Sequence, residues 1–233
     1  MTLKQLIKKL LEIKKMGYIK THRIDDTGIG KTLEDLLGIK ENNLRLPDVG
    51  DIELKAKRIA SDSMLTLATK SPEPKGVNRI LFENYKYRDK EAHYNLHSTV
   101  YGSRFNPQGF KITIKGDKLF LENRNNIEAF WPITIFDDVL KSKSNKVLLV
   151  LAETKGQRKT KDEQFHYVEA YLLSGLNDKN FEVAIMNDML KVDIRIGVYR
   201  SGKRQGIYHD HGTGFRIHKR NILKLYHSFQ KLI

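Results

Sequence analysis

Residues 46–55 carry the sequence Leu-Pro-Asp-Val-Gly-Asp-Ile-Glu-Leu-Lys, in which a turn leads into a strand. Pro47 and Gly50 favour the turn, because proline fixes φ and glycine tolerates conformations that other residues avoid. We therefore expect Asp48 at the mouth of the turn and a strand that begins near Asp51. The segment predicts a strand whose first residues lie beside a polar turn.

Polar and apolar residues alternate along this strand and define its two faces. Glu53 and Lys55 are two residues apart, so they project from the same face. Ile52 and Leu54 project from the opposite face, toward a core. The pattern is that of a half-buried strand.

Asp48, Glu53 and Lys55 have the chemical character of a site that hydrolyses phosphodiesters. Two carboxylates at the start of one strand can bracket a single hard cation such as Mg²⁺. The cation would lower the pKa of a bound water and stabilise charge on the attacked phosphate, and Lys55 would hold or activate that water. The alternative is a solvated strand edge, because Glu-x-Lys is common on exposed strands.

Two other stretches resemble functional motifs. Glu153–Lys155 repeats the Glu-x-Lys pattern without an adjacent Pro-Asp turn, so it is the weaker candidate. Gly28–Thr32 carries Gly-Ile-Gly-Lys-Thr, but a phosphate-binding loop would need a glycine in place of Asp25. The two glycines instead indicate the start of a helix that carries Glu34 toward the metal region.

A pair of strands near the C-terminus, joined by a glycine-rich basic turn, is the second informative feature. Alternation along residues 192–199 puts Asp193, Arg195 and Tyr199 on the polar face. The second strand adds four polar residues: His209, Asp210, His211 and Arg216. Arginine donates to guanine O6 and N7 and aspartate accepts from cytosine N4, so such a ribbon suits the major groove.

Two alternatives apply to this ribbon. His209 and His211 share a face and could bind a metal, although no third ligand is evident. The ribbon could also be a solvated hairpin. Strict alternation groups Arg216 with Asp210 and away from the histidines, unless a bulge at Gly212 or at the next glycine reunites them.

The rest of the chain predicts a mixture of helices and strands, hence an α/β fold, with no internal repeat and no long linker. Helices are expected at 2–16, after residue 30 and at 180–190; strands at 63–69, 147–153 and 167–176; and a hairpin at 111–123. Residues 71–110 are rich in turn formers and are expected to be the least regular part.

The chain is strongly basic. Its 42 Lys and Arg outnumber 28 Asp and Glu, which gives a formal net charge of +14 over 233 residues. Such an excess favours a polyanionic partner, because neutralised phosphates release counterions. Two alternatives apply. The charge could merely keep the protein soluble, or the Lys-rich first helix could lie on an acidic membrane surface.

The absence of cysteine excludes disulfides, thiolate zinc sites and cysteine nucleophiles. No apolar stretch approaches the length of about 20 residues that a membrane span needs. The first residues lack the features of a signal peptide, so a cytoplasmic protein without a membrane partner is expected.

Six segments together resemble the MvaI/BcnI family of type II restriction endonucleases, which are related to the mismatch-repair nicking enzyme MutH. The segments are TGIGKTLEDLLGIKENN, LPDVGDIELK, SMLTLATKSP, KVDIRIGVY, SGK and HDHGTGFRI. The resemblance implies a restriction-endonuclease-like mixed β-sheet flanked by helices, with catalytic and DNA-recognition lobes around a cleft. It implies one endonuclease domain over 1–233, with a catalytic lobe mainly from about 1–75 and 145–190 and a recognition lobe that includes about 191–218.

The resemblance also implies roles for single residues. Asp48, Glu53 and Lys55 would form the active-site triad, with Asp48 and Glu53 as metal ligands and Glu34 as a supporting helix carboxylate. The residues that would face the major groove are Asp193, Arg195, Tyr199, His209, Asp210, His211 and Arg216. The implied substrate is double-stranded DNA at a short CC-N-GG-like site, cut with Mg²⁺ by a monomer, with a cognate DNA methyltransferase as functional partner.

The sequence leaves two other functions open. One is a MutH-like endonuclease that nicks a single strand in response to a repair partner. The other is a DNA-binding regulator without enzymatic activity, which would use the same C-terminal ribbon.

Overall fold

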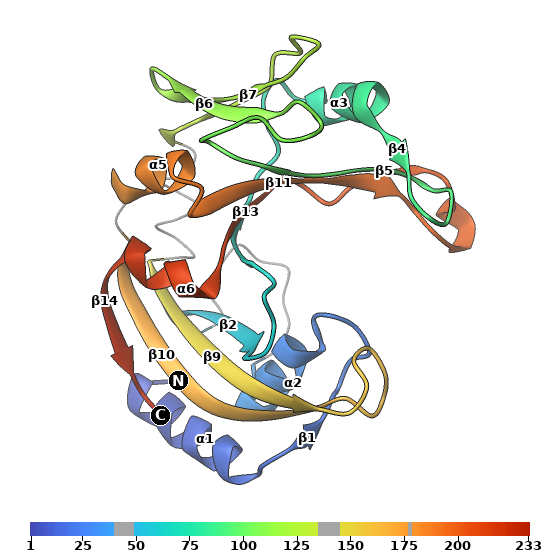
Figure 1. Ribbon diagram of the computed structural model, residues 1–233. Helices are drawn as coiled ribbons and strands as arrows, with labels where there is room; N and C mark the ends of the chain where they lie inside the picture. The colour runs from blue at the N-terminus through green and yellow to red at the C-terminus, as the bar shows by residue number, and fades with distance from the viewer. Residues whose placement is uncertain (40–48, 135–144, 177–178) are drawn as a thin grey trace. The chain divides into compact units, whose positions relative to one another are not determined.

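The computed structural model describes residues 1–39, 49–134, 145–176 and 179–233. The chain divides into two compact units (Figure 1). Unit 1 consists of Met1–Ser63, Lys141–Leu176 and Tyr226–Ile233, and unit 2 consists of Met64–Leu140 and Asn177–Leu225. Glu53 and Lys55 therefore belong to unit 1 and the C-terminal polar strands to unit 2, whereas Asp48 lies outside the described residues.

A mixed five-stranded sheet forms the centre of unit 1. Its strands are β1 (Ile19–Lys20), β2 (Glu53–Arg58), β9 (Lys146–Lys155), β10 (Gln164–Leu176) and β14 (Tyr226–Lys231). The order is β1-β10-β9-β2, with β14 also paired to β10. β2 runs parallel to β9, whereas the other pairs are antiparallel. The expected mixed sheet is therefore present.

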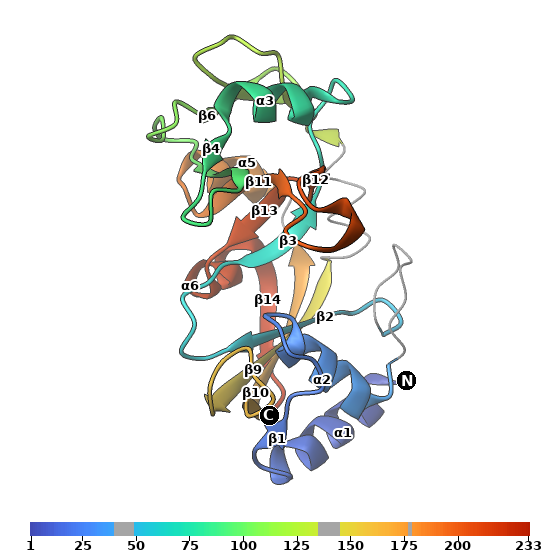
Figure 2. The same ribbon diagram turned by 90° about the vertical axis from the view of Figure 1, so that its right-hand side faces the viewer.

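Two helices, α1 (Leu3–Lys15) and α2 (Gly28–Leu37), pack against this sheet (Figure 2). A capping box between Thr2 and Gln5 begins α1, and Gly38 ends α2 with a φ of 73°. Leucines and isoleucines of both helices form one buried cluster with Ile52 and Leu54. The prediction that Ile52 and Leu54 face a core is confirmed.

Unit 2 contains a six-stranded and a three-stranded sheet. The larger sheet comprises β3 (Leu65–Thr69), β4 (Tyr87–Arg88), β5 (Tyr94–Val100), β11 (Leu190–Val198), β12 (Tyr208–Asp210) and β13 (Gly214–Ile217). The smaller sheet comprises β6 (Lys111–Lys115), β7 (Lys118–Glu122) and β8 (Phe130–Pro132). The helical segments are α3 (Val77–Tyr85), α5 (Lys179–Met186), α6 (Lys219–Ile222), η1 (Gly202–Arg204) and η2 (Leu223–Leu225). The hairpin predicted at 111–123 is confirmed as β6 and β7.

Two predictions for unit 2 were wrong in part, and a third missed regular elements. Residues 71–110, expected to be the least regular part, contain α3, β4 and β5. The predicted second strand of the C-terminal ribbon is split into β12 and β13 at Gly212, whose φ is 74°. The predicted helix at 180–190 ends at Met186, and β11 begins at Leu190.

β11 is an inner strand, not half of an isolated two-stranded ribbon. It pairs with β5 on one side and with β12 and β13 on the other. The polar residues of the predicted ribbon are therefore held in a sheet, which gives them a more rigid support than a free hairpin would.

No helix in the described part of the chain is long and apolar enough to cross a membrane.

Candidate active site and nucleic-acid interface

A tight turn at Val49–Ile52 leads into β2. Val49 N–H donates to the Ile52 carbonyl at 3.0 Å, and Ile52 N–H donates to the Val49 carbonyl at 2.9 Å. Gly50, inside the turn, has a φ of 59°, which glycine adopts without the strain of a side chain. The predicted turn is confirmed, and it fixes where Glu53 enters the sheet.

Glu53 and Lys55 form an ion pair at the start of β2. Lys55 Nζ lies 2.6 Å from Glu53 Oε1. The Glu53 residue is only 7% exposed, and its second oxygen, Oε2, is buried without a hydrogen-bond partner among the described residues. A buried carboxylate oxygen without a donor is costly, so this atom is suited to a ligand that carries positive charge.

The donor set agrees with a hard divalent cation. Mg²⁺ prefers oxygen ligands, commonly one or two carboxylates together with waters. Glu53 Oε2 supplies such an oxygen at the residue that directly follows the Val49–Ile52 turn. Lys55 contacts the other oxygen of the same carboxylate, so a cation at Oε2 does not require the ion pair to break.

Glu34, the expected supporting carboxylate, lies on α2, which packs against β2. Tyr226, at the start of β14, is buried, and its hydroxyl has no hydrogen-bond partner among the described residues. Burial, and then the negative charge of Glu53, raises the pKa of Tyr226, so its hydroxyl stays protonated. Nothing in the sequence beyond its aromatic side chain singled out Tyr226.

The second Glu-x-Lys motif lies elsewhere. Glu53 pairs with Val147 near the start of β9, whereas Glu153 and Lys155 are at the end of that strand. Glu153 is exposed and accepts a hydrogen bond from the Tyr18 hydroxyl at 3.1 Å. The motif is therefore a surface feature at the opposite end of β9.

In unit 2, Asp193 and Arg216 form a partly buried ion pair between β11 and β13. Arg216 Nη1 donates to Asp193 Oδ2 at 2.6 Å, and Nη2 donates to the Met64 carbonyl at 3.0 Å. Asp193 is 6% exposed. Its carboxylate thus orients the Arg216 guanidinium in this structure.

Arg195 is held mainly by backbone carbonyls on the same side of the sheet. Its Nε donates to the Gly212 carbonyl at 3.1 Å, and Nη2 lies 3.3 Å from the His211 carbonyl and 3.3 Å from Thr69 Oγ1. These bonds leave the positive charge of Arg195 without a carboxylate partner in the described ion pairs. A preorganised, uncompensated guanidinium is suited to a base edge or a phosphate.

Three rings lie side by side in this part of unit 2. The ring centroids of Tyr199 and His209 are 4.3 Å apart, and those of His209 and His211 are 4.1 Å apart. Partial burial, and then nearby positive charges led by His209, lowers the pKa of His211, which favours a neutral imidazole near pH 7. His209 and His211 belong to no described cluster of three possible metal ligands, which gives no support to a metal at His-x-His.

The interruption at Gly212 decides which residues share a face. His209 pairs with Gly197 and Arg216 pairs with Lys191, and both partners are odd-numbered positions of β11. Arg216 therefore lies with the histidines, as a break near Gly212 was expected to allow.

Asp210 is not brought together with these residues. It pairs with Ile196, from the other face of β11, and its Oδ2 accepts a hydrogen bond from Asn78 Nδ2 at 2.8 Å. Its Oδ1 accepts the Gly212 N–H at 2.7 Å. In this structure the carboxylate stabilises the turn between β12 and β13.

Asp89, Glu91 and His93 form an acidic cluster whose ligand atoms lie within 4.8 Å of one another. Arg200 donates to Asp89 at 3.0 Å and to Glu91 at 3.1 Å. The guanidinium already neutralises these carboxylates, so the cluster is an ion-pair network at the β4–β5 turn.

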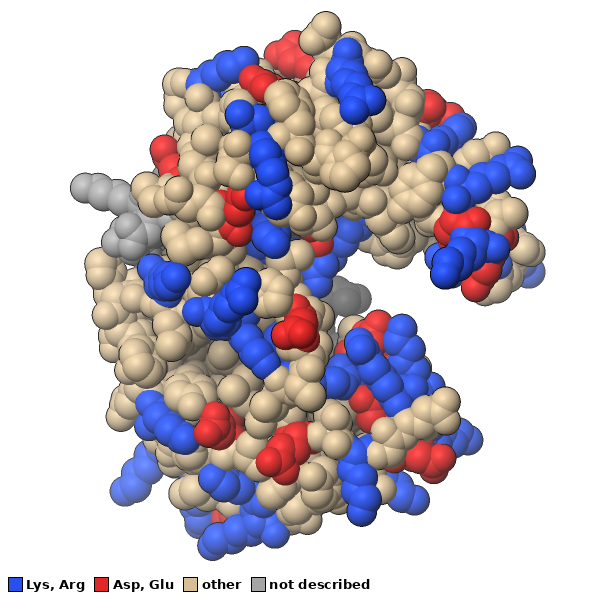
Figure 3. Space-filling model, in the orientation of Figure 1, with Lys and Arg blue, Asp and Glu red and all other residues tan. Residues whose placement is uncertain are grey.

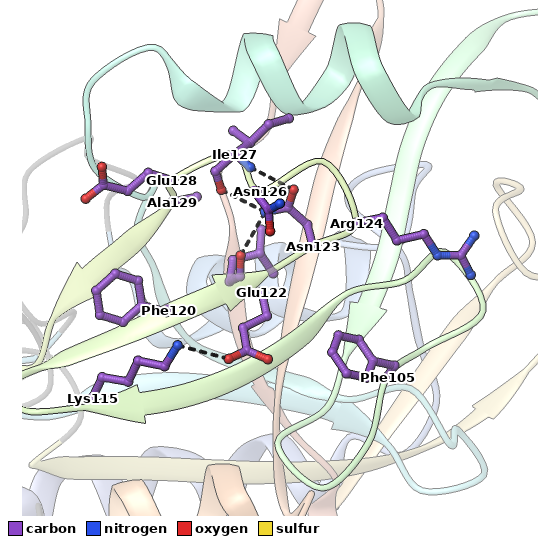
Figure 4. Close-up of a pocket in the computed structure, with 11 residues that line it drawn as sticks. Phe105, Lys115, Phe120, Glu122, Asn123, Arg124, Asn126, Ile127, Glu128 and Ala129 are labelled. Carbon is purple, nitrogen blue, oxygen red and sulfur yellow. Dashed lines mark hydrogen bonds and ion pairs between the residues drawn. The ribbon is translucent and has the colours of Figure 1, made fainter.

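A cavity of about 480 Å³ lies beside β6 and β7 (Figure 4). Lys115 and Glu122 form an ion pair across it at 3.2 Å. Asn123 Nδ2 donates to the carbonyls of Leu121 and Ile127 at 3.0 and 2.7 Å. These groups bind one another and fasten the loop after β7, which indicates a structural role.

Lys and Arg side chains are spread over the face of the molecule shown in Figure 3 and cover parts of both units, in keeping with the net charge of +14. The mixed sheet with its acidic–lysine pair and the sheet with ordered arginines are the arrangement expected of a restriction-endonuclease-like nuclease.

The model of the MvaI/BcnI restriction endonuclease family matches residues 7–226, and the chain belongs to this family. It is therefore a type II site-specific deoxyribonuclease, and the alternative of a regulator without enzymatic activity is excluded.

Two solved structures are similar over the whole chain. The complex of restriction endonuclease MvaI with cognate DNA substrate has 33% sequence identity and a TM-score of 0.88, and the match covers 100% of both chains. MvaI in the absence of DNA has 34% identity and a TM-score of 0.58, with 100% of this chain and 99% of that chain covered. No curated protein sequence matches the chain.

Proposed function

We propose that this restriction endonuclease hydrolyses double-stranded DNA with Mg²⁺ at a short CC-N-GG-like site. The observation that carries the proposal is the buried Glu53 carboxylate, which binds Lys55 through one oxygen and leaves the other without a partner among the described residues. That arrangement supplies a cation ligand and an ammonium group at the same strand start.

In the proposed mechanism, Glu53 and Asp48 hold the metal, and Glu34 supports the site from α2. Bound Mg²⁺ would supply charge stabilisation at the scissile phosphate and a more acidic water. Lys55 would position the attacking water or take part in its deprotonation. Its contact with Glu53 keeps the ammonium group beside the carboxylate before substrate arrives.

Recognition is assigned to the polar face of β11, β12 and β13. Arg195 and Arg216 donate to guanines, while Asp193 acts by orienting Arg216. The residues that complete this surface are Tyr199, His209 and His211. Asp210 is assigned the support of the turn, because it pairs with Ile196 from the other face of β11 and accepts hydrogen bonds from Asn78 and the Gly212 N–H.

The enzyme is proposed to act in the cytoplasm as a monomer, together with a cognate DNA methyltransferase that protects the same site. A DNA complex of the similar enzyme MvaI supports double-stranded DNA as the substrate.

Sequencing the ends of digested DNA tests the proposal. Purified protein with Mg²⁺ should cut DNA of known sequence at one recurring G·C-rich site, and chelator should stop the reaction. Ends without a common sequence would contradict site-specific recognition. Cleavage of one strand only, dependent on an added repair protein, would favour the MutH-like alternative.

A further inference from the structure

β5 lies directly beside β11 in the six-stranded sheet of unit 2. His97 of β5 pairs with Arg195, and Thr99 pairs with Asp193. Paired residues on neighbouring antiparallel strands project from the same face. His97 therefore shares the face on which Arg195 and Arg216 lie, although it is distant from both in the sequence.

A cavity of about 420 Å³ opens on this face. Its lining includes His97 and Thr99 from β5 as well as Arg195, His211 and Arg216. Residues from three separate stretches of the chain thus surround one polar hollow. β5, which lies in the region expected to be the least regular, supplies part of the cavity wall.

The His97 side chain is available for a ligand. It is exposed, and its imidazole makes no hydrogen bond with any described residue. Asp193, which lines the same cavity, differs because it is bound by Arg216. An imidazole beside the Arg195 guanidinium presents an N–H donor to a partner rich in acceptors.

We propose that His97 is a further specificity-determining residue, which donates a hydrogen bond to the N7 acceptor of a purine next to the base contacted by Arg195. The inference rests on the proposed use of this face for DNA recognition. Purine N7 lies in the major groove, where it accepts hydrogen bonds from side chains. His97 would thereby make β5 a third strand of the recognition surface.

The test uses duplexes in which one purine of the site at a time carries carbon in place of N7. Wild-type cleavage should fall on the order of 10-fold at the position that His97 contacts. His97→Ala should show no further loss at that position, while the losses at the remaining purines persist. His97→Gln, which keeps a donor, should recover part of the sensitivity.

His227→Ala is the matched control, since His227 is also exposed but lies on β14 in unit 1. Its sensitivity to each modified purine should equal that of the wild type, and neither variant should lose affinity for random DNA. Equal losses in wild type and His97→Ala at every purine would overturn the assignment of His97 and leave the nuclease itself intact. Absence of site-specific cleavage by the wild type would instead contradict the proposed function, and the inference with it.

Discussion

Lys55 is the residue whose removal should separate chemistry from binding. Lys55→Ala is expected to lower the cleavage rate by about 100-fold or more, because it removes the ammonium group beside Glu53. Its affinity for cognate DNA should stay close to that of the wild type. Single-turnover cleavage and a binding titration measure the two quantities.

Lys231→Ala is the control for this variant, because it removes an exposed ion pair with Glu169 in the same unit. Near-normal cleavage by Lys55→Ala would place the active site elsewhere, and Glu153 would be the first residue to test.

Arg216 is expected to contribute specificity. Arg216→Ala should weaken cognate binding by about 1–3 kcal/mol and leave binding to random DNA almost unchanged. It also leaves the Asp193 carboxylate buried without its ionic partner, so the Tm should fall. Arg104→Ala removes an exposed contact to Asp188 and serves as control. If cognate and random DNA lose affinity equally, Arg216 contacts phosphates.

Residue spacing predicted which side chains share a face of each strand, but not which side chains bind one another. The two-residue period was sufficient to separate Glu53 and Lys55 from Ile52 and Leu54. It could not show that Asp193 binds Arg216, because that contact joins two residues that are 23 positions apart in the sequence. The same limit concealed His97, whose place depends on strand pairing.

At the scale of elements, the break between β12 and β13 depends on Gly212. This glycine has a φ of 74°, and a Cβ there would lie 2.6 Å from Thr69 Cγ2. Its carbonyl accepts a hydrogen bond from Arg195. Gly212→Ala should therefore cost about 1–2 kcal/mol in backbone strain and, in addition, displace Arg195 and weaken cognate binding.

Gly206→Ala provides a matched control for this prediction. Gly206 has a φ of 79°, and a Cβ there would meet nothing within 4 Å. Urea denaturation should show a similar backbone cost in both variants, with a further loss in Gly212→Ala. Cognate affinity should fall only for Gly212→Ala. Equal affinities would show that the break does not position Arg195.

Elements with a clear period were predictable, whereas those built by long-range pairing were not. α1 has its apolar positions at helical spacing, and β9 is a continuous apolar run. β5 was not predicted, because its buried residues include the polar Asn95 and Ser98, which interrupt the alternation of apolar and polar residues typical of a strand. Their burial follows from side-chain and tertiary contacts, such as the bond from Asn106 Nδ2 to Ser98 Oγ at 2.8 Å.

For the whole molecule, the sequence contains one Pro-Asp turn followed by Glu-x-Lys, so the proposed active site would act on one scissile phosphate at a time. A homodimer would cut both strands by symmetry. A monomer must cut them in succession, so nicked circles should accumulate early when plasmid with one site is digested. The initial rate should rise linearly with enzyme. A second-order dependence, or direct conversion to linear DNA, would favour a dimer.

The proposed mechanism requires that the Glu53 carboxylate hold the cation needed for cleavage. The most direct measurement is the single-turnover cleavage rate of a single-site duplex over a range of Mg²⁺ concentrations, for wild type and for Glu53→Gln. The wild-type rate should rise to saturation and vanish with chelator, whereas Glu53→Gln should require more Mg²⁺ and reach a rate lower by about 100-fold or more. Cleavage that persists in chelator, or an unchanged Mg²⁺ dependence in Glu53→Gln, would contradict the account.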